Sequence, residues 1–233
     1  MPFYDNFSQV APSGMGLRLA DAESANLLRA IRKHGAPVSV LEIGPGRGGF
    51  ARACDVHSMD YTCLDISRPL LRALTGRKRL ETFAPPIPLA DAHFDLAYAA
   101  NLLEHMPGFR AANGLLEEMA RVARPGGLIC HRVPNVMAWG NHFWNGDYTH
   151  SFPTTPRNVS QAYLDAGLHV EAVYPVSGPV VGRLAYLVSI VGKLIPSFLV
   201  DHGAYVTSRL SKSIYSAKTT FLRGFLIVGR KPS

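Results

Sequence analysis

A short apolar run, residues 40–43, leads directly into a turn rich in glycine and then into a helical pattern. The turn places Gly44, Gly46 and Gly49 in the spacing G-x-G-x-x-G. A buried strand that passes through such a turn into a helix is typical of nucleotide-binding α/β sheets, because glycine lets the backbone approach a ligand closely. The spacing alone does not decide which ligand is bound.

The rest of the chain alternates between short apolar runs and helical patterns. The predicted strands are 38–43, 61–66, 94–100, 126–133, the segment up to 176 after Gly167, and 225–231. The predicted helices are 17–34, 48–54, 67–75, 108–123 and 160–167. Strands that are apolar throughout, separated by helices, indicate a doubly wound and mostly parallel α/β sheet with both faces covered.

Two residues of the glycine turn argue against a dinucleotide. Pro45 lacks the backbone N–H that would donate to a phosphate, and Glu42 places a carboxylate where it would repel a diphosphate. S-adenosylmethionine (SAM) carries an ammonium and a sulfonium and no phosphate, so the sequence favours SAM. Asp65, after the second strand, suits the ribose hydroxyls of either ligand and cannot discriminate between them.

Longer stretches resemble class I SAM-dependent methyltransferases. PIPLADAHFDLAYAANLLEHMPG and LLEEMARVARPGGLICHRVPN are similar to the fourth- and fifth-strand blocks of that family, and the likeness extends over about residues 38–175. It implies a seven-stranded Rossmann-like sheet with an antiparallel last strand and a C-terminal helical insertion before it. The implied SAM contacts are Glu42, Gly44 and Gly46 for the methionine part, Asp65 for the ribose, Ile66 for the adenine, and Asn101 and Leu102 near the methyl group.

One stretch departs from the family pattern. Relatives often carry an Asp that meets the adenine amino group, whereas the matching segment here, 81–89, has no clear equivalent. Phe83 and the backbone are the expected substitutes.

The predicted organisation has four parts: an N-terminal lid or helix (1–36), the methyltransferase core (37–179), a basic apolar helical region (180–223), and the last strand with its tail (224–233). Phe3, Tyr4 and Phe7 could close over SAM, with Arg18 meeting its carboxylate; a frayed leader is the alternative.

The first residues lack the features of a signal peptide, so a cytoplasmic location is expected. Cys54, Cys63 and Cys130 are expected to be buried thiols.

A second block, 133–168, is similar to bacterial methyltransferases of surface-polysaccharide and lipopolysaccharide clusters. The resemblance implies a sugar hydroxyl or a related glycan as acceptor. O- or C-methylation of a small metabolite such as a quinone or polyketide is the alternative, and a non-catalytic SAM-fold scaffold is the second. Phe143, Trp144 and Tyr148 in this block suit either sugar stacking or packing.

The expected catalytic residues are histidines, because an alcohol attacks a methyl group well only as its proton leaves. His150 is favoured over His105, since Asp147 lies three residues before it and could orient its ring. A purely structural role for each histidine is the competing interpretation. No metal is predicted, because His142, Asp147 and His150 do not show the spacing of a known metal site.

The excess charge lies in the C-terminal part. Residues 172–233 hold eight Lys and Arg and one acid, while the whole chain has 24 basic and 17 acidic residues, so the first 171 residues are neutral. A neutral core without a basic groove argues against nucleic-acid binding.

The apolar stretch 183–200 is interrupted by Lys193 and Pro196 and is too short to span a membrane. It is expected either to pack on the core or in a homodimer, or, within 183–223, to lie on an anionic membrane at the inner face.

Overall fold

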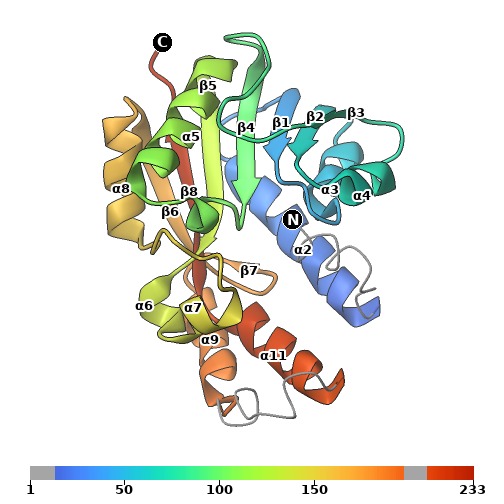
Figure 1. The fold of residues 1–233 in the computed structure, drawn as a ribbon, viewed down its shortest axis with the longest axis vertical. Coiled ribbons are helices and arrows are strands. Elements are labelled where there is room, and N and C mark those ends of the chain that lie inside the picture. The colour runs from blue at the N-terminus through green and yellow to red at the C-terminus, as the bar shows by residue number, and fades with distance from the viewer. Residues whose placement is uncertain (1–13, 197–208) are drawn as a thin grey trace.

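The computed structural model describes residues 14–196 and 209–233, and it shows one twisted sheet between two layers of helices (Figure 1). The sheet order is β3-β2-β1-β4-β5-β8-β6-β7. Its strands are β1 (Ser39–Ile43), β2 (Asp60–Asp65), β3 (Lys78–Glu81), β4 (Phe94–Ala100), β5 (Ala123–Pro134), β6 (His169–Ser177), β7 (Val180–Val181) and β8 (Gly224–Arg230). The α/β class and the predicted strands are confirmed, apart from the short β3 and β7, which the sequence analysis missed.

The sheet is mostly parallel. Strands β1 to β5 pair in parallel, and β8 runs antiparallel to both β5 and β6. The predicted number of seven strands is wrong for this chain. After β6 the chain turns back at once and forms a hairpin with the two-residue β7, which adds an eighth strand at the edge.

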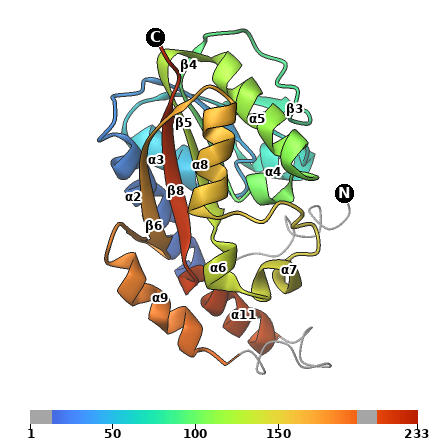
Figure 2. The ribbon, with the colours of Figure 1, turned by 90° about the vertical axis from the view of Figure 1, so that its left-hand side faces the viewer.

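Helices cover both faces of the sheet, as Figure 2 shows from the side. They are α2 (Gly14–Ile31), α3 (Gly49–Val56), α4 (Arg68–Ala73), the 3-10 turn η1 (Leu103–His105), α5 (Phe109–Val122), α6 (Val136–Trp139), α7 (His142–Gly146), α8 (Pro156–Asp165), α9 (Ala185–Leu194) and α11 (Arg209–Phe221). One core lies under α2 and α3, the other under α5 and α8. Alternate residues of each strand supply the two cores, so Val40 faces one side while Leu41 and Ile43 face the other.

The start of α8 follows from its first residues. Thr155 accepts a hydrogen bond from the Asn158 N–H, the Asn158 side chain accepts one from the Thr155 N–H, and Pro156 occupies the first helical turn. This reciprocal cap satisfies N–H groups that the helix itself leaves unpaired. The cap marks the end of the loop that carries His150.

Four helices, α6, α7, α9 and α11, gather at the end of the sheet where β4 and β5 have their carboxyl ends (Figures 1 and 2). Helix α9 approaches α11 through Gly192, where a Cβ would come within 2.8 Å of the Leu222 backbone nitrogen. The Lys218 ammonium of α11 donates to the carbonyl of Ile195 at 2.5 Å, just beyond the end of α9. A cation at this position stabilises the helix C-terminus.

The three cysteines are buried and unpaired with one another, as predicted. No helix within 14–196 and 209–233 has the length and apolar character needed to cross a membrane. Phe3, Tyr4 and Phe7 lie outside the described residues, and Arg18 lies on α2 with an exposed side chain.

Candidate active site

The glycine turn after β1 forms one wall of the carboxyl edge of the sheet. Gly44, Gly46 and Gly48 have φ values of 70°, 50° and 72°, which side chains other than glycine rarely adopt. A Cβ built on Gly46 would have no atom within 4 Å, so the backbone there faces open space. The same atom on Gly44 would lie 3.7 Å from Leu102, which brings the end of β4 against the glycine turn.

Glu42 lies inside the sheet, beneath this turn. Its side chain is 2% exposed and accepts a hydrogen bond from the Tyr61 hydroxyl of β2. Burial raises the pKa of Glu42 to about 7, and the Tyr61 bond opposes only part of that rise. Near pH 7, a carboxyl group with this pKa is present in both its protonated and its charged form.

Asp65 ends β2 beside the glycine turn. Its Oδ1 accepts from the Ser67 N–H at 2.8 Å, and burial raises its pKa while the Ser67 and Ile66 N–H groups oppose the rise. A carboxylate has about four acceptor positions, so capacity remains for two hydroxyl donors. Phe83, after β3, is 68% exposed.

Asn101 follows β4 and adopts a left-handed conformation, with φ of 48°. Arg132 of β5 holds it there: the guanidinium donates to Asn101 Oδ1 at 2.5 Å, and the Asn101 N–H donates to the Arg132 carbonyl at 2.8 Å. Arg132 also donates to Glu23 of α2 at 2.8 Å and is 6% exposed. Neither Arg132 nor Glu23 was predicted from the sequence, although a charged residue at the end of an otherwise apolar strand was a usable signal for Arg132.

The histidines of the two family blocks meet at the same end of the sheet. The ring centroids of His105, in η1, and His150, after α7, are 4.7 Å apart. The loop that carries His150 is fixed to η1, because the Glu104 carbonyl accepts from the Ser151 and Phe152 N–H groups at 2.8 and 3.0 Å. The two predicted histidines therefore lie next to each other. His105 is also close to the end of β4, because it comes three residues after Leu102 in the chain.

Hydrogen bonds decide how these two rings are oriented. Thr149 Oγ1 donates to Asp147 at 2.6 Å and lies 2.7 Å from His105 Nδ1, so it must accept the Nδ1 hydrogen of His105. His150 Nδ1 bonds the Phe143 carbonyl, which can only accept. In each ring Nδ1 thus carries the hydrogen and Nε2 keeps the lone pair.

The role predicted for Asp147 is wrong in one respect. Its carboxylate was expected to orient the ring of His150, but it accepts from the N–H and hydroxyl of Thr149 instead. The backbone turn places Thr149, two residues on, closer to the carboxylate than the ring of His150. Asp147 therefore acts on His105, through Thr149, and His150 is oriented by the backbone.

Burial controls the charge of this cluster. It lowers the pKa of His105 to about 4, with the neighbouring His150 adding to the effect, and it also lowers the pKa of His150. Burial raises the pKa of Glu104, which is 1% exposed, to about 8. Near neutral pH both imidazoles are therefore uncharged, as a proton acceptor or a metal ligand requires.

The aromatic residues of the same loop divide into two kinds. Phe143 is fully buried and packs against His150, with ring centroids 4.6 Å apart. Trp144 and Tyr148 are 51% and 77% exposed. Phe143 is thus a packing residue, while Trp144 and Tyr148 expose their rings in the same loop.

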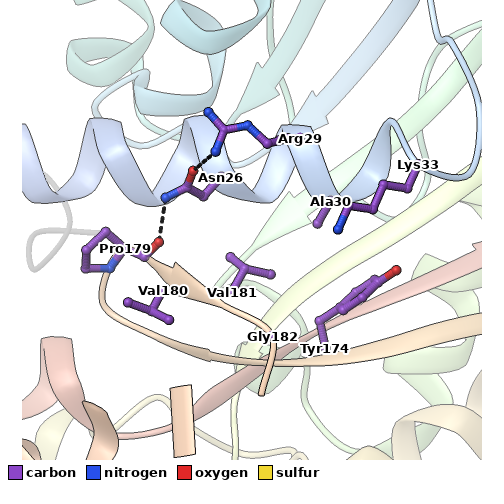
Figure 3. Close-up of a pocket in the computed structure, with 9 residues that line it drawn as sticks. All are labelled: Asn26, Arg29, Ala30, Lys33, Tyr174, Pro179, Val180, Val181 and Gly182. Carbon is purple, nitrogen blue, oxygen red and sulfur yellow. Dashed lines mark hydrogen bonds between the residues drawn. The ribbon is translucent and has the colours of Figure 1, made fainter. Parts of the chain in front are cut away.

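A separate groove lies between α2 and the β6–β7 hairpin (Figure 3). Asn26 of α2 donates to the Pro179 carbonyl at 2.7 Å across it, and Arg29 donates to Asn26. Its lining includes none of the predicted cofactor or catalytic residues. The groove therefore does not belong to the site at the carboxyl edge of the sheet.

Comparisons with known proteins agree with this geometry. A family model described as a methyltransferase domain matches residues 41–131. A malonyl-[acyl-carrier protein] O-methyltransferase from Pseudescherichia vulneris is 33% identical over 111 residues, which make up 46% of this chain and 43% of that protein. The match thus spans less than half the length of this relative.

Solved structures show the same fold at low identity. A chain in the complex between the Haloferax volcanii Trm112 methyltransferase activator and a methyltransferase superposes with a TM-score of 0.67 and 16% identity, covering 99% of this chain and 98% of that one. The N-methyltransferase NodS from Bradyrhizobium japonicum, solved with S-adenosylhomocysteine (SAH), gives 0.59 and 15%, covering 90% and 86%. The fold is the one seen in these methyltransferase structures, and residues 41–131 match the methyltransferase-domain family. These findings support SAM as the cofactor.

The buried carboxyl of Glu42 makes stability depend on pH. The pKa of Glu42 is about 7 in the folded chain against 4.5 ordinarily, so its contribution is complete below about pH 4.5 and is lost as pH rises through 7. At about 1.4 kcal/mol per pKa unit, the loss is about 3 kcal/mol. We expect the difference in unfolding free energy between the wild type and Glu42→Gln to fall by that order between pH 5 and pH 8, measured by urea unfolding without SAM. A difference independent of pH would contradict the assignment.

Proposed function

We propose that this protein transfers a methyl group from SAM to an acceptor oxygen. The observation that carries the proposal is that the methyltransferase-domain match, 41–131, contains the glycine turn, Asp65, Asn101 and His105, all at the carboxyl ends of β1, β2 and β4. Ligands of open α/β sheets bind outside this edge. A non-catalytic scaffold with the same fold is the alternative, and measured consumption of SAM separates the two.

The cofactor would be held by residues that fit it chemically. The open backbone at Gly46 and the close approach at Gly44 suit the methionine part, and Asp65 suits the ribose hydroxyls. Ile66 and the exposed ring of Phe83 suit the adenine, while Asn101 and Leu102 face the acceptor side. Glu42 would counter the ammonium from beneath the turn. When bound, SAM supplies an electrophilic methyl group.

The acceptor would bind beside His105 and His150. Much of the rate should come from holding the acceptor oxygen in place, which can be worth several powers of ten. The uncharged rings offer Nε2 lone pairs that can remove or stabilise the proton of a hydroxyl group. Asp147 and Thr149 are positioning residues in this account, because they fix the tautomer of His105.

For the acceptor we favour a hydroxyl of a glycan or glycan precursor. The support is the likeness of block 133–168 to polysaccharide-cluster methyltransferases, together with the exposed rings of Trp144 and Tyr148, which suit sugar stacking. The named activity of the Pseudescherichia vulneris relative suggests a different acceptor, a carboxyl oxygen on an acyl chain. A carboxylate is already deprotonated, so it would not need a base, whereas an alcohol does.

We also propose that α9 touches an anionic membrane surface. The buried residues of α9 are the small ones, Ala185, Ser189 and Gly192, and Gly192 lies against the end of α11, so the large apolar side chains of α9 are left exposed. Those side chains are between 48% and 73% exposed: Leu184, Tyr186, Leu187, Ile190, Val191 and Leu194. An apolar helix face flanked by cations, in a C-terminal part with a net charge of +7, suits an anionic bilayer. A homodimer interface is the competing use of this face.

Replacing Asp65 tests the cofactor site. We expect Asp65→Ala to weaken SAH binding by about 1.5–3 kcal/mol for each lost hydroxyl bond, because each is assisted by the carboxylate charge. Calorimetry with SAH measures this, and Asp60→Ala at the other end of β2 is the matched control. Tight binding of NAD with no binding of SAH would overturn the cofactor assignment.

Replacing His150 tests the catalytic assignment. We expect His150→Ala to lower turnover by about 100-fold or more while SAH affinity stays nearly constant, because the ring acts on the acceptor and not on the cofactor. His169→Ala, at an exposed position on β6, is the control. Retained turnover would move the role to His105. If neither ring mattered, a carboxylate acceptor would be favoured over an alcohol.

Vesicle binding tests the role of α9. We expect co-sedimentation with anionic vesicles at low salt that weakens at moderate salt, and none with neutral vesicles. Leu187→Ser combined with Ile190→Ser should abolish it, whereas Leu164→Ser on α8, also exposed, should not. Absence of binding at low salt, together with a dimer in gel filtration that the double variant disrupts, would assign the face to self-association.

A further inference from the structure

Three side chains that can bind a metal ion lie close together at the acceptor side of the site, although the sequence predicted no metal site. One ligand atom each from Glu104, His105 and His150 lies within 4.8 Å of the others. Two imidazoles and one carboxylate form a ligand set that binds divalent transition metals such as zinc and iron. The set escapes a sequence search because His150 comes from a distant segment.

Glu104 supplies an independent indication of a cation. Its side chain is 1% exposed, and Oε2 has no hydrogen-bond partner among the described residues. A buried carboxyl oxygen without a donor is costly and rarely retained. A bound cation beside it would remove that cost, since metal coordination is one of the ways in which proteins accommodate buried charge.

The two histidine rings are already arranged as ligands. Asp147 and Thr149 fix His105, and the Phe143 carbonyl fixes His150, each through Nδ1. Metal-binding histidines are characteristically fixed in this way, with the second ring nitrogen bonded to a carboxylate, a hydroxyl or a carbonyl. Nε2 of each ring would then be the coordinating atom, and the Asp147 carboxylate would balance part of the charge of a bound cation.

We propose that Glu104, His105 and His150 bind one divalent first-row transition-metal ion, which holds the acceptor oxygen. This proposal rests on the function proposed above and refines it. Three protein ligands leave coordination positions for an oxygen from the acceptor. Coordination makes a hydroxyl more acidic, so its proton passes to solvent water. The oxygen lone pair then forms the bond to the methyl carbon, and the carbon–sulfur bond breaks with its electron pair left on sulfur.

The ligand set also predicts which metals bind. Imidazole suits zinc, cobalt and iron, whereas magnesium prefers oxygen ligands and retains its waters. A site with two imidazoles and one carboxylate should therefore bind Zn²⁺ and Co²⁺ and discriminate against Mg²⁺.

The test is a metal titration of the full chain after chelation, without a histidine tag. We expect one Zn²⁺ per chain, displacement by Co²⁺ with visible absorption bands of a site with nitrogen and oxygen ligands, and no competition from millimolar Mg²⁺. Glu104→Gln, His105→Ala and His150→Ala should each weaken Zn²⁺ binding about 10- to 100-fold or more, while His169→Ala leaves it unchanged. Unchanged affinity in all three variants would overturn the proposal.

SAH binding to the same samples separates this proposal from the function on which it rests. Variants that bind SAH but not Zn²⁺ support the metal site and show that they are folded. If the wild type binds SAH but no Zn²⁺, the metal site is overturned and the methyltransferase proposal stands. If the wild type does not bind SAH, the result counts against the methyltransferase proposal. Should the variants not fold, X-ray absorption of the zinc-loaded wild type decides, since a sulfur shell from the cysteines would overturn the assignment.

Discussion

The carboxyl edge of the sheet depends on the interactions of the Arg132 side chain. Its buried guanidinium joins Glu23 of α2 to Asn101 after β4, so one side chain connects the covering helix, the fourth strand and the fifth. Removing one partner of a buried ion pair commonly costs about 3–5 kcal/mol, because the other charge is left uncompensated. Here the loss would also release Asn101, whose left-handed backbone is what turns the chain from β4 toward Leu102 and η1.

The position of η1 in turn sets the acceptor side of the site. The Glu104 carbonyl holds the backbone of the loop at Ser151 and Phe152, and the Glu104 side chain lies buried beside the two histidines. A loop that is fixed at its backbone on one side and by the cap of α8 on the other can hold His150 with little freedom. Rigid support of this kind is needed where an acceptor atom must be held close to a methyl group.

The helices after β7 follow a different rule from the rest of the fold. In α2, α3, α5 and α8, large apolar side chains such as those of Leu28, Phe50 and Leu115 face the two cores. In α9 the order is reversed, because Gly192 permits a backbone approach to α11 that only small residues can fill. The apolar surface of α9 is therefore a consequence of close helix packing, and its large side chains stay about half exposed or more, with Arg223 lying over the Tyr186 ring.

The sequence alone determined the α/β class, the positions of most strands and helices, and the choice of SAM over a dinucleotide. These features depend on local patterns: apolar runs, helical spacing, glycine in a turn, and the missing N–H of Pro45. It did not predict β3, whose exposed residues carry no apolar pattern, or the eighth strand, which exists only because β7 pairs with β6.

Only the tertiary structure decided the chemistry at the acceptor side. Sequence spacing suggested that Asp147 orients His150, whereas the folded loop directs that carboxylate to Thr149 and so to His105. Arg132, Glu23 and Glu104 come from elements far apart in the chain, so no local pattern shows which groups each of them meets in the folded protein. The pKa values of Glu42, Glu104 and His105 likewise follow from burial, which depends on what the rest of the fold places around each group.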